Sequence, residues 1–167
     1  AHSFAVGAWR EILLRIFADF QARDEYSPDW LVNPRTGRRL KLDRYYPELG
    51  IAIRFVGLQG RQNYRLSDEE QQQEAERNAA REQLCAERGI TLVQIDPDDG
   101  EPWLAAGRIR SALNRTARLL AQSTQVDAKY KRTLTPRIVA AQRRCDEIQA
   151  QLRRPDGLKL YADLAQD

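Results

Sequence analysis

Hydrophobic positions in the first hundred residues change between helix spacing and strand spacing. From 4 to 22, apolar residues recur every three or four positions, which predicts an amphipathic helix. Segments 30–33, 39–46 and 51–57 are short and apolar or alternating, and turns containing Pro and Gly separate them, so they predict three consecutive strands. The third, "IAIRFVG", is apolar on both faces except at Arg54, and we expect it inside a sheet.

A second helix and a fourth strand follow. Ser67 and Glu70 form a capping-box pattern, and Gly89 stands where the helix should end. Segment 90–96, "ITLVQID", is β-branched and apolar, which is typical of a strand. Because a helix connects it to the earlier strands, we expect it to pair in parallel with one of them.

Two more helices are predicted after residue 101. The first spans about 102–122, and the second begins after Thr135, with Pro136 in its first turn. The second carries apolar residues in alternating steps of three and four, which predicts packing on a neighbouring helix or a homodimer through helix 136–153. These positions are Ile138, Ala141, Cys145, Ile148 and Leu152. We therefore expect a core at 1–100 and a basic helical extension, packed on it, at 101–167.

Composition excludes several classes of protein. Hydrophobic residues make up 42% and charged residues 31%, the balance of an ordinary globular protein. No apolar run approaches the roughly 18 residues of a membrane span, so no membrane partner is expected. The two cysteines, Cys85 and Cys145, lie far apart, which indicates a reducing, cytoplasmic setting without a disulfide framework.

Histidine is almost absent. The one histidine is His2, so the chain offers no internal imidazole for Ser-His-Asp or Cys-His catalysis or for most catalytic zinc sites. Acid–base or metal chemistry would have to use carboxylates, which favours Mg²⁺ or a similar hard cation.

Charge is unevenly distributed. Residues 1–100 carry 14 Lys and Arg against 17 Asp and Glu, whereas residues 101–167 carry 13 against 7. A basic C-terminal part favours a polyanion as partner. An arginine-rich composition with solvated helix faces would give the same imbalance.

Two stretches resemble a known family. They are "LDRYYPELGIAIRFVGLQG" (42–60) and "ERNAAREQLCAERGITLVQI" (76–95). They are similar to the PD-(D/E)XK, or restriction-endonuclease-like, superfamily, in the small branch related to very-short-patch-repair endonucleases. The resemblance covers about residues 28–96. It implies an α/β fold with a restriction-endonuclease-like αβββαβ core and a mixed sheet, here followed by C-terminal helices.

The resemblance also implies a site. Family members hydrolyse phosphodiesters with a divalent metal held between carboxylates, one from each strand of a hairpin. Asp43 matches the first acid, but Arg54 stands at the second. Val56 and Gly60 replace a further acid and a histidine, and Gln59 is retained.

Hairpin geometry suggests a reason for the arginine. If the loop is 47–50, Tyr46 faces Ile51 and Asp43 lies across from Arg54. An arginine in an apolar strand is costly unless it is paired. We therefore predict an Asp43–Arg54 pair in the metal's place and a decayed catalytic site that needs no cofactor.

An active site with rearranged acids is the alternative. Asp43 would then hold Mg²⁺ together with an acid from elsewhere, although each candidate acid also reads as a surface residue. The candidates are Glu11, Glu48, Glu74 and Glu82. Glu11 comes first, because the first helix often faces the active site in the resembling fold.

Arginines supply the candidate contacts to nucleic acid, since guanidinium forks match phosphate oxygens. Any one of them could equally form a surface salt bridge. The candidates are Arg38, Arg39, Arg44, Arg61 and Arg65 around the hairpin, Arg77 and Arg81 on the next helix, and Arg108, Arg115, Arg143 and Arg144 on the terminal helices. Tyr45, Tyr46 and Tyr64 could stack on bases.

Three functions remain open. The first is a nucleic-acid-binding domain, for DNA rather than RNA, with a decayed nuclease site. The second is an active Mg²⁺-dependent endonuclease. The third is a non-enzymatic assembly module that dimerises through helix 136–153.

Overall fold

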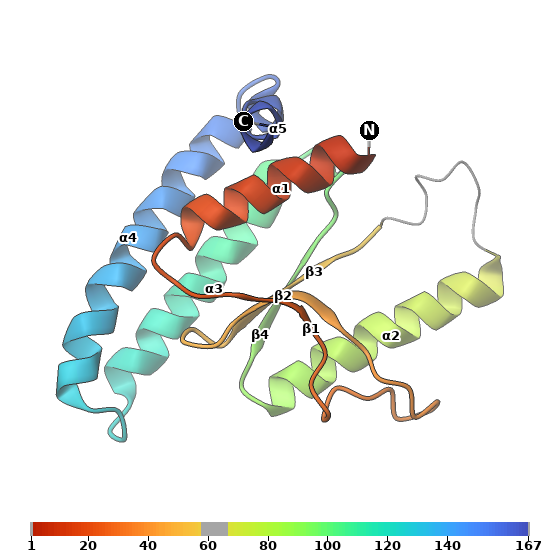
Figure 1. Cartoon of the computed structure of the whole chain (residues 1–167), viewed down its shortest axis with the longest axis horizontal. Helices are drawn as coiled ribbons and strands as arrows, with labels where there is room; N and C mark the ends of the chain where they lie inside the picture. Colours follow the sequence, from red (N-terminus) through yellow and green to blue (C-terminus); the bar gives the residue numbers. More distant parts are fainter. Residues whose placement is uncertain (1, 58–66, 167) are drawn as a thin grey trace. The chain divides into compact units, whose positions relative to one another are not determined.

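The chain contains two compact units. The computed structural model describes residues 2–57 and 67–166 (Figure 1). One unit consists of residues 1–21 and 97–167 and is helical, and the other consists of residues 22–96 and contains all four strands. The first helix thus belongs to the same unit as the C-terminal helices.

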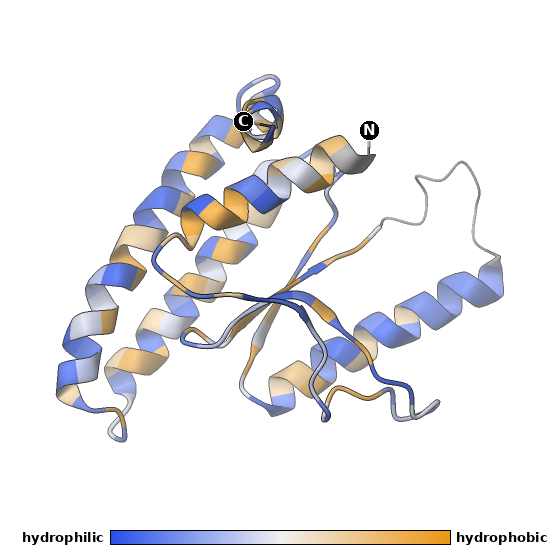
Figure 2. Cartoon of the chain, in the orientation of Figure 1, coloured by the Kyte–Doolittle hydropathy of each residue, from blue (hydrophilic) through white to orange (hydrophobic). Residues whose placement is uncertain are grey.

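The helical unit contains four helices: α1 (His2–Ile16), α3 (Pro102–Gln122), α4 (Ala128–Leu152) and α5 (Gly157–Ala165). α1 packs on α5, and α3 packs on α4. Figure 2 shows hydrophobic and hydrophilic residues alternating along α1, α3 and α4, as the sequence pattern requires. In the described part of the chain, no helix combines the length and the apolar character that a membrane span requires.

The sequence missed the true start of α4. Its N-cap is Asp127, whose side chain accepts a hydrogen bond from the Lys129 backbone N–H at 3.0 Å, and Pro136 lies inside the helix. The predicted start at Pro136 was therefore wrong. The short helix α5 was not predicted.

The apolar seam of α4 is used within the chain. All five seam residues are buried, and the Cys145 thiol donates to the Ala106 carbonyl of α3 at 3.3 Å. The prediction that the seam meets a neighbouring helix is thus confirmed. Because the seam is already covered by α3, the structure gives no support to a homodimer through helix 136–153.

The second unit is a four-stranded mixed sheet with one helix. Its elements are β1 (Arg23–Tyr26), β2 (Leu42–Tyr46), β3 (Ile51–Phe55), α2 (Asp68–Glu87) and β4 (Thr91–Ile95). The sheet order is β1-β2-β3-β4, with antiparallel pairing up to β3 and parallel pairing between β3 and β4. An α/β class, an interior β3 and a parallel fourth strand are all as predicted.

The first strand differs from the prediction. Segment 30–33 contributes only an isolated bridge between Val32 and Arg39, and the edge strand is instead Arg23–Tyr26. That strand is polar and largely exposed, so it carries no apolar alternation from which a strand could be recognised.

Helix α2 has the predicted ends. The Ser67 hydroxyl accepts from the Glu70 N–H at 3.1 Å, and the Glu70 carboxylate accepts from the Ser67 N–H at 3.0 Å, which completes the capping box. At the other end, Gly89 has φ +71° and Ile90 N–H donates to the Cys85 carbonyl, the Schellman arrangement.

One end of α2 is held by a hydrophobic cluster on the sheet. Cys85, Ala80 and Leu84 of the helix pack with Leu42 and Ala52 of the strands. Figure 2 shows the rest of α2 as largely hydrophilic. The apolar contact therefore holds α2 against the sheet near the C-terminus of the helix. The N-terminal part of α2 is mainly polar.

Candidate functional site

The register of the β2–β3 hairpin is the predicted one. Tyr46 pairs with Ile51, Tyr45 with Ala52 and Arg44 with Ile53. Side chains two residues apart lie on the same face of a strand. Since Ala52 packs in the cluster under α2, Arg54 faces the same side of the sheet.

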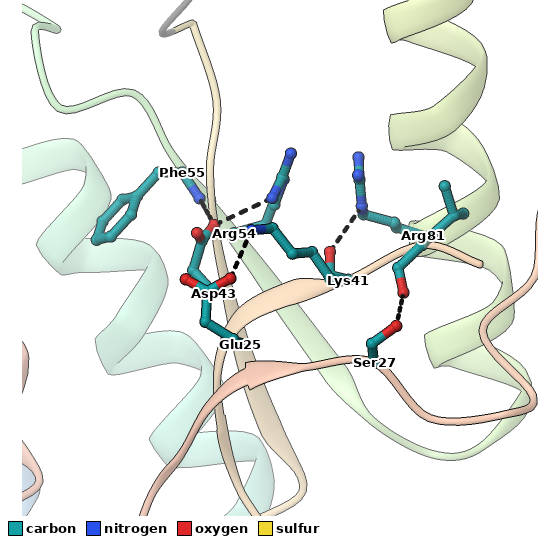
Figure 3. A network of polar contacts seen from close by, with 8 residues as sticks. Glu25, Ser27, Lys41, Asp43, Arg54, Phe55 and Arg81 are labelled. Atoms are coloured by element: carbon teal, nitrogen blue, oxygen red, sulfur yellow. Dashed lines mark hydrogen bonds and ion pairs between the residues drawn. The ribbon is translucent and has the colours of Figure 1, made fainter. Parts of the chain in front are cut away.

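Asp43 and Arg54 meet, as predicted. Arg54 Nη1 lies 3.5 Å from Asp43 Oδ2, and the Phe55 backbone N–H donates to that same oxygen at 2.8 Å (Figure 3). Both side chains are 18% exposed. The carboxylate thus replaces a backbone acceptor at the end of the strand pair, and the guanidinium neutralises its charge.

This arrangement does not suit a divalent cation. Asp43 Oδ2 already receives two N–H groups, and the neighbouring Arg54 guanidinium carries a positive charge that would repel a metal ion. Within residues 2–57 and 67–166, no three His, Cys, Asp or Glu side chains form a group that could hold a metal. We therefore derive no metal-dependent step from these residues.

Arg81 of α2 enters the same region but is buried. Only 4% of the residue is exposed. Its Nε donates to the Lys41 carbonyl at 3.0 Å and its Nη1 to Asn78 Oδ1 at 2.9 Å. Burial, aided by the charges of Arg54 and Arg77, lowers the pKa of Arg81 to about 10. Arg81 is thus not a surface phosphate contact of the kind predicted.

Two further ion pairs surround this centre. The Lys41 ammonium donates to Glu25 Oε2, beside the Asp43–Arg54 pair in Figure 3. Arg77 donates to Glu74 Oε2 through Nη2 at 2.6 Å. Lys41 and Glu25 were not predicted as site residues from the sequence. A signal was present for Lys41, because it lies two residues before Asp43 and therefore on the same strand face.

Glu25 has an unusual backbone. Its φ is +51°, in the left-handed region that few residues other than glycine adopt. It lies between the paired positions Asp24–Arg44 and Tyr26–Leu42, on the edge strand next to Asp43. A polar edge strand gives no sequence pattern from which this placement could be read.

A basic groove lies next to Arg77. It has a volume of about 510 Å³ and is walled mainly by polar side chains. Its cations are Arg35, Arg38, Arg39 and Arg77. Arg35 is held by Glu76 at 2.8 Å, and this hydrogen bond keeps the pKa of Glu76 below its ordinary value. Among the described residues, the Arg38 guanidinium has no ion-pair partner.

Other predicted residues have structural partners. Arg39 contacts Asp29 at 2.9 Å, and Arg44 contacts Asp24 at 2.7 Å. In the helical unit, Glu11 pairs with Arg15 at 2.7 Å.

Arg144 has a structural role within the helical unit. It donates to the Ile16 carbonyl at 2.8 Å, at the last residue of α1, and to Asp19 at 3.2 Å. It therefore satisfies an unpaired helix carbonyl. Gln59, Arg61, Tyr64 and Arg65 lie outside the described residues.

Comparison of the chain with protein-family models, with curated proteins and with solved structures finds no match. The resemblance to the PD-(D/E)XK superfamily therefore rests on the motif around Asp43 and on the order of the elements.

Proposed function

We propose that this chain is a nucleic-acid-binding domain with a restriction-endonuclease-like fold whose metal-dependent catalysis has been lost. The observation that carries the proposal is the Asp43–Arg54 pair, because the resemblance gives these two positions to the acids that would hold a metal. The αβββαβ order and the mixed sheet are compatible with that fold.

Binding is supported by the arginines that surround the pair. Four guanidiniums line the groove of about 510 Å³ next to α2, and three of them belong to the loop and bridge region 33–40. Phosphate oxygens are the natural ligands of guanidinium forks. The excess of basic residues in 101–167 adds to the attraction for a polyanion.

Fluorescence anisotropy with a labelled duplex of about two helical turns tests the proposal. We expect binding in EDTA, with an affinity that falls steeply between about 50 and 200 mM salt. DNA is the expected ligand, and a single-stranded RNA of equal length serves as the comparison. Absence of binding to either at low salt would contradict the proposal.

The matched variant is Arg38→Gln. Because its guanidinium has no ion-pair partner among the described residues, its removal should cost little stability. One lost phosphate contact should reduce the slope of log affinity against log salt by about 0.9 for a duplex. Arg10→Gln on the exposed surface of α1 makes the same change of charge outside residues 101–167 and serves as control.

A further inference from the structure

Among the described residues around Asp43, one buried cation, Arg81, forms no ion pair of its own. Lys41 pairs with Glu25, Arg54 with Asp43 and Arg77 with Glu74. Arg81 is the remaining cation in this described cluster, and its acceptors, the Lys41 carbonyl and the Asn78 amide, are both neutral. A buried charge with only neutral partners is unfavourable.

Arg54 adds a second guanidinium that is only partly paired among the described residues. Its contact with Asp43 is long, at 3.5 Å, and its Nε is buried without a hydrogen-bond partner among the described residues. Figure 3 shows the Arg54 and Arg81 side chains extending toward the same side, one from β3 and the other from α2. Two incompletely satisfied guanidiniums therefore share this region.

Arg77 connects the cluster to the surface. It precedes Arg81 by one helical turn, its side chain is 39% exposed, and it also lines the basic groove. Its charge and that of Arg54 both act on Arg81. The three guanidiniums thus form one electrostatic group that reaches the surface at Arg77.

We propose that Arg54, Arg77 and Arg81 form a binding site for one phosphate group of a nucleic-acid backbone. The identity of the ligand rests on the proposed function, whereas the anion site rests on the geometry of the cluster. Arg77 and Arg54 contact the phosphate oxygens, and Arg81 supplies positive charge from beneath. Fixed guanidiniums thereby provide the charge that a metal ion provides in the resembling nucleases.

A phosphate fits this cluster better than a carboxylate does. Its oxygens point in several directions and can accept from guanidiniums on both a strand and a helix. The groove beyond Arg77 carries Arg38, so an extended strand could place its next phosphates there. The site therefore deepens the proposed function by fixing where the strand enters the domain.

Inorganic phosphate is the direct test, with the thermal midpoint measured against acetate at equal ionic strength. Phosphate should raise the midpoint of the wild type through preferential binding to the folded state. Arg54→Gln should weaken phosphate binding about tenfold, since it removes one charge-assisted contact. Arg88→Gln, at the C-cap of α2 about two turns beyond Arg81, should respond as the wild type does.

An equal phosphate response in Arg54→Gln and the wild type would overturn the anion site. Duplex binding, measured in parallel by anisotropy, keeps this failure separate from failure of the proposed function. If phosphate binding depends on Arg54 but no duplex or RNA binds, the site stands and the nucleic-acid function is wrong. If duplex binds with an unchanged salt slope in Arg54→Gln, and phosphate binding is also unchanged, the function stands and the site is wrong.

Discussion

Arg54 and Asp43 face each other across the β2–β3 hairpin, with Arg54 Nη1 3.5 Å from Asp43 Oδ2. The same carboxylate oxygen accepts the Phe55 N–H at 2.8 Å. Asp43 thus links the end of β3 to β2 through a hydrogen bond, and it also neutralises the charge of Arg54 in an otherwise apolar strand. In the metal-dependent nucleases that the motif around Asp43 resembles, the two matching positions would hold two acids.

Placing an acid at position 54 should change the response to metal. In Arg54→Glu, two carboxylates would face each other, so we expect the free energy of unfolding to fall by about 1–3 kcal/mol without metal. Mn²⁺ or Mg²⁺ should recover part of that loss, because a divalent cation bridges the acids. Urea denaturation with and without Mn²⁺ measures both effects.

Arg54→Gln is the matched control for that variant, since it removes the cation without adding an acid. It should show no stabilisation by Mn²⁺. Equal stabilisation of Arg54→Gln and Arg54→Glu would show that the metal binds elsewhere.

Asp43 should contribute through its acceptor oxygen as well as through its charge. Asp43→Ala leaves the Phe55 N–H without its side-chain acceptor and Arg54 without its counter-ion, so we expect a loss of about 2–3 kcal/mol. Asp43→Asn keeps an oxygen that can accept from Phe55 and should lose about half as much. Chemical denaturation of the two variants gives the comparison, and equal losses would show that the hydrogen bond contributes nothing.

The hairpin could be predicted because its signals are local. The turn 47–50 and the apolar run after it fix which residues pair, so the Asp43–Arg54 contact followed from the register. Cap residues at Ser67 and Gly89 likewise fixed the ends of α2. These features depend on a few neighbouring residues, and the sequence contains all of them.

Features that depend on tertiary context could not be predicted. The polar strand Arg23–Tyr26 forms because β2 offers it an edge, which no pattern within that strand reveals. Helix α4 continues through Pro136 although proline normally ends or starts a helix. Burial of Arg81 was missed because helix periodicity alone does not show which arginine points at the sheet.

Arg81 should lower the free energy of unfolding, because its charge is buried, while it adds positive charge to the proposed phosphate site. The pKa of Arg81 is lowered to about 10 in the folded state, below the ordinary 12.5. Its charge therefore lowers the free energy of unfolding at neutral pH, and this penalty is relieved as the pH rises above 10. Arg81→Met should therefore keep or raise the free energy of unfolding, by up to about 2 kcal/mol. It should also weaken phosphate binding.

Thermal unfolding and phosphate titration of Arg81→Met measure both parts. Arg81→Lys is the comparison, because it keeps the charge but cannot make both hydrogen bonds. A large loss of stability in Arg81→Met would show that its bonds to Lys41 and Asn78 outweigh the cost of the buried charge.

The two buried thiols should make stability fall at alkaline pH. Burial raises the pKa of Cys85 to about 11 and that of Cys145 to about 12. Above about pH 9 the unfolded chain releases thiol protons that the folded state keeps, so rising pH favours unfolding. Each thiol contributes at most about 1.4 kcal/mol per pH unit.

Denaturation between pH 8 and 10.5 measures this slope, and Cys145→Ala should reduce it by one thiol's share. The native protein should also react with a thiol reagent only as fast as it opens, because both cysteines are buried. Rapid labelling of either cysteine in the native state would contradict the burial on which this prediction depends.

Incubation with supercoiled plasmid in Mg²⁺, Mn²⁺ or EDTA, followed by electrophoresis at low salt, shows whether the domain binds DNA without cleaving it. The Asp43–Arg54 pair predicts that the plasmid is retarded equally in all three conditions and is recovered fully supercoiled after the protein is removed. Metal-dependent nicking that disappears in Asp43→Ala would contradict the account and show that Asp43 still serves a nuclease.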